Sequence, residues 1–247
     1  MYHTVTPEGF KTLPTFVNPS TMKKHTTPIC CGTFYHIYNR GINGEDLFKE
    51  ERNYAFFLRQ YAKYIQPVAE TYAYCLLKNH FHLLVRTREP AEVITNVGRV
   101  TNVGRVTNVG RVTNVGRVTN PSDVNNADKL ISNQFSKLFN SYAQAINKAH
   151  HRTGGLFEEL FRRIPVESDA YFLELVYYIH ANPQKHGFVE DFRDYPHSSY
   201  HTHLSKMDTK LKRTELLNWF GDPNGYQRYH LPNQVLEHLD RFEIEFD

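Results

Sequence analysis

A perfect tandem repeat divides this sequence into two parts. The hexapeptide Thr-Asn-Val-Gly-Arg-Val begins at four positions six residues apart, from Thr95 to Thr113, and a fifth copy starting at Thr119 is cut short by Pro121. A period of six gives no apolar stripe on a helix, and a glycine in every hexad weakens helix and strand interiors. Four copies are too few for a β-helix, which stacks several coils. We therefore predict a mobile loop insert over residues 92–126 with no part in the core.

The segments on either side of the insert show strand and helix patterns in alternation. Lys78-Asn79 would join two of the strands, although a bulge in one long strand fits equally well. Ser168 is the expected N-cap of the last helix, and Asn182-Pro183 its expected end. In chain order we expect a strand at 32–40, a helix at 50–65, strands at 69–77 and 80–86, a helix at 129–150, a strand at 162–166 and a helix at 169–181. This order predicts an α+β fold, a ferredoxin-like antiparallel sheet with helices packed on it.

Composition limits the classes of protein that fit. Of the 247 residues, 40% are hydrophobic and 22% charged, and the net charge is +3, values typical of a globular chain with a core. Neither an apolar run of about 20 residues nor a secretory signal is present, so we expect a cytoplasmic protein without a membrane partner. The three cysteines, Cys30, Cys31 and Cys75, form neither a CxxC pair nor a disulfide framework. Cys75 is expected to be a small core residue.

Two histidines stand two positions apart in His80-Phe81-His82. On a strand their imidazoles project from the same face, while Phe81 points to the other. Such a pair can bind one divalent cation, but it needs further ligands and is also compatible with ordinary buried or surface histidines.

A second group of polar side chains lies in Tyr178-Ile179-His180-Ala181-Asn182-Pro183. On a helix, Tyr178 and Asn182 are four residues apart and share one face, so a phenol and an amide oxygen could meet the same ligand. The alternative is a core tyrosine followed by an ordinary helix stop. Tyr142 also lies on an expected helix, but the residue four positions later is Ile146, which cannot be a ligand.

Taken together, five segments resemble the single-tyrosine HUH transposases, specifically the transposase-like group that includes the REP-associated tyrosine transposases. The resemblance runs from about residue 32 to residue 200, apart from the insert, and the family usually has a tryptophan where His197 stands. The segments are GTFYHIYNRG at 32–41, YCLLKNHFHLLV at 74–85, GLFE at 155–158, YIHANP at 178–183 and YPHSSY at 195–200.

The resemblance implies a ferredoxin-like domain that cuts and rejoins single-stranded DNA. It implies His80 and His82 as metal ligands, Asn182 as the third ligand and Tyr178 as the nucleophile. A phenol has an unperturbed pKa of about 10, so the metal must polarise the scissile phosphate. Mg²⁺ or Mn²⁺ suits imidazole and amide oxygen ligands in an open site. Attack by the phenol gives a 5′-phosphotyrosine and frees a 3′-hydroxyl, and because bond energy is conserved no ATP is needed.

The expected partner is single-stranded or hairpin DNA, with a homodimer kept as one alternative. The domain is expected at 29–204, interrupted by the insert, with an N-terminal extension at 1–28 and a C-terminal one at 205–247. Trp219 is expected to pack a C-terminal helix onto the domain. Basic residues next to the motifs are candidate DNA contacts: Arg40, Lys78, Arg86, Arg152, Arg162 and Arg163.

Two other functions remain open from the sequence. The first is a catalytically inactive or domesticated protein of the same fold that binds single-stranded or hairpin DNA without cutting it. The second is a phosphohydrolase that uses the His-x-His pair on small nucleotides. A covalent protein–DNA adduct distinguishes the transposase from both, and the phosphohydrolase would be indifferent to Tyr178.

Overall fold

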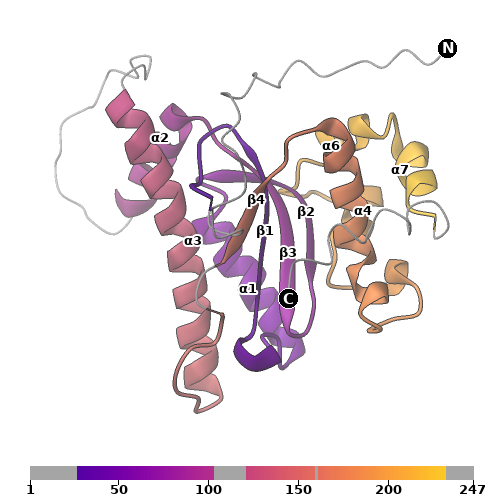
Figure 1. The fold of residues 1–247 in the computed structure, drawn as a ribbon, viewed down its shortest axis with the longest axis horizontal. Coiled ribbons are helices and arrows are strands. Elements are labelled where there is room, and N and C mark those ends of the chain that lie inside the picture. Colours follow the sequence, from indigo (N-terminus) through magenta and orange to yellow (C-terminus); the bar gives the residue numbers. More distant parts are fainter. Residues whose placement is uncertain (1–26, 103–120, 159–160, 232–247) are drawn as a thin grey trace, which may run out of the picture.

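A four-stranded antiparallel sheet is the centre of the molecule. The computed structural model describes residues 27–102, 121–158 and 161–231. Its strands are β1 (Phe34–Arg40), β2 (Ala69–Leu76), β3 (His80–Thr87) and β4 (Arg162–Pro165), arranged in the order β2-β3-β1-β4 (Figure 1). This is the strand order of a ferredoxin-like sheet, so the predicted α+β fold class is confirmed.

The segment around Lys78-Asn79 is a hairpin connection. The strands β2 and β3 pair antiparallel, with Leu76 opposite Phe81, so the alternative of one bulged strand is wrong. A register shift does occur, but between Thr71 and Ala73, inside β2. The hairpin is fixed from outside the sheet because the carbonyl oxygen of Lys78 accepts hydrogen bonds from the backbone N–H groups of Leu47 and Phe48.

One face of the sheet is covered by α1 (Glu51–Tyr64), α2 (Pro90–Asn102) and α3 (Pro121–Ala149) (Figure 1). We call this the α3 face. Helix α1 begins at a capping box in which Glu50 and Asn53 each accept a backbone N–H at the helix start. Its buried Phe57 and Tyr61 pack on the sheet with Phe81 of β3 and Phe135 of α3. This layer is an apolar core.

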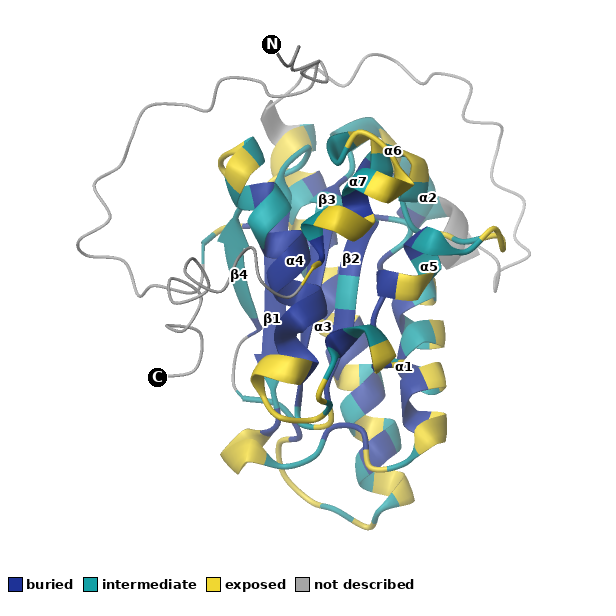
Figure 2. Ribbon diagram, turned by 90° about the vertical axis from the view of Figure 1, so that its right-hand side faces the viewer, coloured by how far each residue is buried: buried dark blue, intermediate teal, exposed yellow. Residues whose placement is uncertain are grey.

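The opposite face is covered by α4 (Asp169–Lys185), with α5 (Tyr200–Leu204), α6 (Arg213–Trp219) and α7 (Pro223–Tyr229) packed around it (Figures 1 and 2). We call this the α4 face. The Ser168 side chain accepts the backbone N–H of Tyr171, which confirms the predicted N-cap. Trp219 stacks on Phe172 with ring centroids 4.5 Å apart, so it packs α6 onto the domain as predicted. Cys75 is buried in this layer, also as predicted.

The predicted end of α4 at Asn182-Pro183 is wrong. Pro183 lies inside the helix, which continues to Lys185. A proline removes only its own N–H from the helical ladder, and the carbonyl oxygens of Asn182 and Pro183 still accept the N–H groups of His186 and Phe188. Both residues are buried, and the Asn182 side chain is bonded to His80 of β3, which holds this turn of the helix on the sheet.

The predicted loop over 92–126 is wrong at both of its described edges. Helix α2 runs through the first hexad to Asn102, and α3 begins at Pro121. The cause is burial: Val93 and Val97 are four residues apart and both lie in the α3-face core, which offsets the low helix propensity of Gly98. Residues 103–120 lie outside the described residues, and the domain boundaries stay a prediction. No helix in the described ranges is both long and apolar enough to cross a membrane.

Candidate functional site

The strand β3 separates two kinds of side chain. Phe81 and Leu83 belong to the apolar core of the α3 face, whereas Leu84 belongs to the core beneath α4. Because side chains alternate along a strand, His80 and His82 project to the α4 face together with Leu84. Both imidazoles are buried, with 4% and 0% of the residue exposed. The expectation that the two rings share a face is met by this strand.

The neighbouring strand β1 adds a histidine that the sequence reasoning missed. Tyr38 lies opposite His82 in the register, and His36 Nε2 lies 3.0 Å from His82 Nδ1. The signal was present, because His36 and Tyr38 alternate with the core residues Tyr35 and Ile37 just as His80 and His82 alternate with Phe81. A hydrogen bond to one ring nitrogen of a histidine determines its tautomer.

Helix α4 brings Asn182 and Tyr178 to this histidine pair. Asn182 Oδ1 lies 3.0 Å from His80 Nε2, although the two residues are 102 positions apart in the chain. The Tyr178 ring meets the His82 ring edge to face with centroids 5.5 Å apart. Tyr178 and Asn182 of α4 therefore face His80 and His82 of β3.

The last turn of α4 supplies two more polar groups next to the site. Lys185 Nζ lies 5.3 Å from the centroid of the Tyr178 ring, and the His186 ring lies 4.8 Å from that of His80. Neither was predicted, because the sequence reasoning ended the helix at Pro183. A cation beside a phenol stabilises negative charge on its oxygen.

Both histidines of β3 are held neutral at pH 7. Burial lowers the pKa of His80 to about 4, against a smaller opposing effect of the hydrogen bond to Asn182. The pKa of His82 is also lowered well below its usual value, first by burial and then by the neighbouring charges of His80 and His36. Neutral imidazole is the form that binds metal ions.

The donor set fits a divalent cation. Ligands on an octahedral Mg²⁺ lie about 2.0 to 2.1 Å from the ion, so two adjacent ligands lie about 3.0 Å apart. His80 Nε2 and Asn182 Oδ1 have this separation. In the described part of the chain no three His, Cys, Asp or Glu side chains converge as a metal site, so a cation here has to use the Asn182 amide oxygen. The amide nitrogen of Asn182 is buried without a hydrogen-bond partner among the described residues.

The six predicted DNA-contact cations are dispersed. Arg40 and Arg162 both pair with Glu158, and the register puts Arg40 opposite His80 and Arg162 opposite Tyr38, on the side of the site. The other four lie elsewhere: Arg86 pairs with Glu89, Lys78 with Asp46 and Arg152 with Glu45, while Arg163 is bonded to the carbonyl oxygen of Thr27. The structure thus brings two of the six to the predicted site.

The alternative tyrosine lies on the other face of the sheet. Tyr142 of α3 is fully buried in the α3-face core, and its hydroxyl donates to the carbonyl oxygen of Leu47 at 2.8 Å. Burial raises the pKa of this phenol well above its usual value. Tyr142 is therefore a core residue with a satisfied hydroxyl.

The segment YPHSSY at 195–200 is hydrogen-bonded to β2. The hydroxyl of Tyr195 donates to the carbonyl oxygen of Leu76, and the Ser199 Oγ accepts the N–H of Tyr74. The same hydroxyl group of Ser199 lies 2.8 Å from His180 Nε2 on α4, between Tyr178 and Asn182. His197, where the family usually has tryptophan, stacks on Tyr54 with centroids 3.5 Å apart. This motif therefore positions the helix of the site relative to the sheet.

Comparison with known proteins gives two similarities. No protein-family model matches the sequence. The chain is 26% identical over 136 residues to a putative REP-associated tyrosine transposase of Haemophilus influenzae, an alignment that covers 53% of this chain and 59% of that protein. A structure of a REP-associated tyrosine transposase bound to a REP hairpin aligns with 75% of this chain and 87% of that one, at 15% identity and a TM-score of 0.45. The chain thus matches about three fifths of the length of the Haemophilus protein, and the resemblance predicted from the motifs is confirmed.

Proposed function

We propose that this relative of the REP-associated tyrosine transposases binds single-stranded or hairpin DNA, cuts one strand and rejoins it through a 5′-phosphotyrosine intermediate. Tyr178 is the nucleophile, and His80, His82 and Asn182 hold one divalent cation, Mg²⁺ or Mn²⁺. The Haemophilus relative supports the class of activity. The roles of the individual residues are our proposal.

One observation carries the proposal: His80 and Asn182 meet at 3.0 Å from elements 102 residues apart, and Tyr178 lies on the same face of the same helix. A buried histidine and asparagine could pair for stability alone. A structural pair, however, does not require a second histidine on the same strand face, a third histidine bonded to it and a tyrosine one turn away. This combination is what a phosphate-transfer site uses.

Each group has a separate task in the reaction. The cation, when bound, withdraws charge from the scissile phosphate. The Tyr178 oxygen forms a bond to phosphorus, the bond from phosphorus to the 3′-oxygen breaks, and the phenol proton leaves while the departing 3′-oxygen takes up a proton. Lys185, beside the Tyr178 ring, stabilises charge on the phenol oxygen. Attack of a 3′-hydroxyl on the phosphotyrosine reverses these bond changes.

His36 is a positioning residue in this scheme. Its Nε2 is bonded to His82 Nδ1, which directs the other ring nitrogen of His82 toward the cation site. The ring of His36 is itself fully buried and lies against Tyr38 with centroids 4.8 Å apart, so its orientation is held by packing.

Access to the site requires movement. Tyr178 is only 2% exposed, and His82 and Asn182 are fully buried. A DNA phosphate can reach them only if the groups that cover them shift. The exposed residues Lys185 and His186, at the end of α4, border the site from the solvent side. We place the entry of the strand there.

The test is a covalent adduct on a denaturing gel. A labelled DNA hairpin with single-stranded flanks is incubated with the protein and Mn²⁺, and a band that resists denaturation is expected. Tyr178→Phe should abolish this band, whereas Tyr177→Phe should keep it, because the Tyr177 ring packs against Phe192 and His230 and not against His80 or His82. An adduct formed equally by both variants would overturn the assignment.

The burial of Tyr178 favours a second candidate, a protein of the same fold that binds hairpin or single-stranded DNA without cutting it. It predicts hairpin binding by the wild type and Tyr178→Phe alike, with no adduct from either. A phosphohydrolase of small nucleotides would instead turn over its substrate, form no adduct and be unaffected by Tyr178→Phe.

A further inference from the structure

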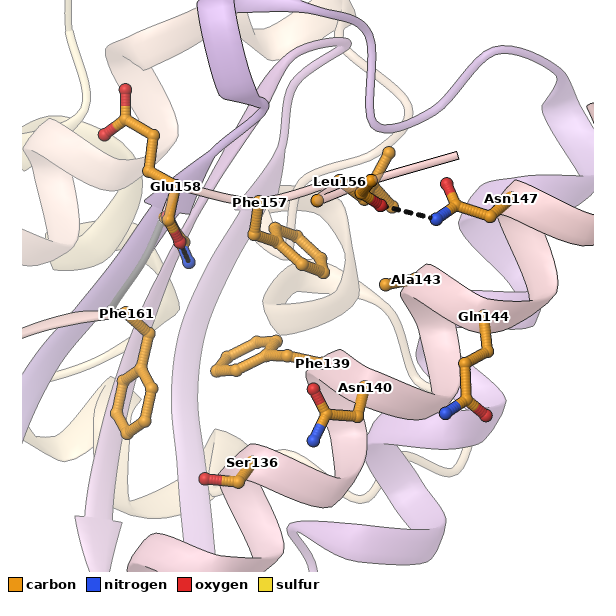
Figure 3. Close-up of a pocket in the computed structure, with 13 residues that line it drawn as sticks. Ser136, Phe139, Asn140, Ala143, Gln144, Asn147, Leu156, Phe157, Glu158 and Phe161 are labelled. Carbon is orange, nitrogen blue, oxygen red and sulfur yellow. Dashed lines mark hydrogen bonds between the residues drawn. The ribbon is translucent and has the colours of Figure 1, made fainter. Parts of the chain in front are cut away.

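A pocket on the α3 face takes no part in the proposed cation site. It has a volume of about 400 Å³ and lies between α3 and residues 154–158, where the rings of Phe139, Phe157 and Phe161 gather (Figure 3). None of its lining residues is a proposed ligand or the proposed nucleophile. The groups that can adjust the cation site lie instead around His80, at the turn between β2 and β3.

His80 lies between two amide oxygens. Its Nδ1 is 2.8 Å from Oδ1 of Asn79, and its Nε2 is 3.0 Å from Oδ1 of Asn182. Both separations are those of hydrogen bonds, and an amide oxygen can only accept. A neutral imidazole carries one N–H, and burial keeps His80 neutral at pH 7. His80 can therefore donate to only one of the two oxygens at a time.

The position of this single proton decides whether His80 can bind a cation. With the proton on Nε2, the imidazole donates to Asn182, and the bond occupies both groups that the cation would use. With the proton on Nδ1, the imidazole donates to Asn79, and the lone pair of Nε2 points toward the cation site. Asn79 therefore competes with Asn182 for the proton of His80.

Asn79 is held in place by the backbone of its turn. Its carbonyl oxygen accepts the N–H of Gly41 at 2.8 Å, and Leu77 donates to the carbonyl oxygen of His80 at 2.8 Å across the turn. A Cβ at position 41 would lie 1.9 Å from the carbonyl oxygen of Glu45, so only glycine fits there. These contacts fix the backbone from which the Asn79 side chain reaches Nδ1 of His80.

Asn182 can adapt to a proton on Nδ1. Its amide nitrogen is buried and has no hydrogen-bond partner among the described residues. When the amide rotates by half a turn, this nitrogen donates to the lone pair of His80 Nε2, so the rotation costs no hydrogen bond. The amide oxygen returns to the site when a cation binds.

We propose that Asn79 is a positioning residue that keeps the N–H of His80 on Nδ1 and thereby leaves Nε2 available to the cation. The inference rests on the proposed function, because it takes His80 and Asn182 as ligands. It gives the two histidines of β3 the same arrangement, since His82 Nδ1 is bonded to His36. In both rings, a hydrogen bond at Nδ1 orients Nε2 toward the cation site.

The tautomer of His80 tests this role without a cation. A long-range ¹H–¹⁵N correlation spectrum of the full chain in EDTA at neutral pH shows which ring nitrogen carries the proton, and His80→Gln identifies the signals of this ring. We expect the proton on Nδ1 in the wild type. In Asn79→Leu, which has a side chain of similar size without an acceptor, we expect it on Nε2. Asn79→Asp keeps an acceptor and should keep the proton on Nδ1.

The affinity for Mn²⁺, measured by electron paramagnetic resonance without DNA, is the second readout. Asn79→Leu should bind Mn²⁺ about 10- to 100-fold more weakly than the wild type, whereas Asn79→Asp should bind it at least as tightly. A matched control, Asn140→Leu at an exposed position of α3, should leave the affinity unchanged. Because Asn79 is only half-buried, Asn79→Leu should fold.

The possible failures are distinguishable. A wild-type proton on Nε2, or equal Mn²⁺ affinity of the wild type and Asn79→Leu, would overturn the role of Asn79 alone. The same holds if Asn79→Asp binds Mn²⁺ as weakly as Asn79→Leu, because the side chain would then serve the turn and not the imidazole. A wild type that binds no Mn²⁺, or binds it equally well after His80→Gln, would overturn the proposed cation site together with it.

Discussion

The two faces of the sheet are built from the same strands but differ in chemistry. On the α3 face, β1 and β3 present Tyr35, Ile37, Phe81 and Leu83 to an apolar core. On the α4 face the alternate residues include His36, His80 and His82. All six histidines that are buried in the described ranges belong to this second layer, namely His36, His80, His82, His180, His203 and His230.

This difference assigns separate roles to the two layers. Apolar packing stabilises a fold without directing any reaction, whereas buried imidazoles cost stability below about pH 6.5, because burial disfavours their protonated form. Both layers have an apolar core, but among the described residues only the α4 layer also contains buried histidines. The proposed phosphate-transfer site accounts for His36, His80 and His82 on this side of the sheet.

Neighbouring residues of β3 should respond in opposite ways to substitution. Phe81→Ala should lower the free energy of unfolding by about 3 to 5 kcal/mol, because it opens a cavity in the α3-face core. His82→Gln should abolish adduct formation with a much smaller loss of stability. Urea unfolding and the adduct gel measure the two effects. A His82 variant that cuts DNA normally would remove the distinction between the faces.

Acid should weaken the α4 face first. Burial lowers the pKa of His203 to about 4 and that of His230 to about 3, so both are neutral in the folded protein and take up protons on unfolding. The free energy of unfolding should be at its full value above pH 6.5 and should decrease as the pH falls toward 4. The contribution of His203 to this decrease is about 2 kcal/mol at pH 5.

Hydrogen exchange at pH 5 and pH 8 locates this acid effect. The amide protons of helices α4 to α7 should lose protection at pH 5 before those of α1 and α3. The reason is that the buried histidines, within the described ranges, all lie in the layer of α4 to α7. His203→Gln should reduce the pH dependence. Equal loss of protection in both layers would contradict the assignment of acid sensitivity to the α4 face.

Two deletions in the repeat should differ in effect. Removing Thr101 to Val118 leaves the sequence of α2 unchanged to its last residue, because Thr119-Asn120 repeats Thr101-Asn102. Removing Thr95 to Val118 also deletes Val97, which is 5% exposed in the α3-face core. The longer deletion should cost about 1 to 2 kcal/mol more in unfolding free energy. Identical melting temperatures would show that the first hexad has no packing role.

The smallest effect is expected at a cation outside both faces. Lys78 pairs with Asp46 at 3.3 Å, and its side chain is 56% exposed. Lys78→Gln should change stability by less than about 1 kcal/mol. If Lys78 contacts a phosphate, Lys78→Gln should weaken the binding of all hairpins equally and reduce the slope of log affinity against log salt concentration by about one. The control variant Lys148→Gln should leave this slope unchanged. Unchanged salt dependence would remove Lys78 from the DNA contacts.

The helices and strands could be predicted because the spacing of their apolar side chains is visible within a short stretch of sequence. The alternation in β1 and β3 and the N-cap at Ser168 follow from neighbouring residues. Two features could not be predicted in this way: the continuation of α4 past Pro183 and the helical conformation of the first hexad. Both depend on burial against segments that are distant in the sequence. For the same reason, the predicted pairing of His80 with Asn182 came from resemblance to a family, and the bond from His36 to His82 was missed.

Mapping the DNA adduct shows most directly whether the α4 face supplies the nucleophile. Wild-type protein is trapped on a hairpin substrate with Mn²⁺ and digested, and the nucleotide-bearing residue is sequenced by tandem mass spectrometry. We expect the nucleotide on Tyr178. A nucleotide on Tyr142, in the core of the opposite face, or on Tyr177 would contradict the roles of both Tyr178 and Asn182.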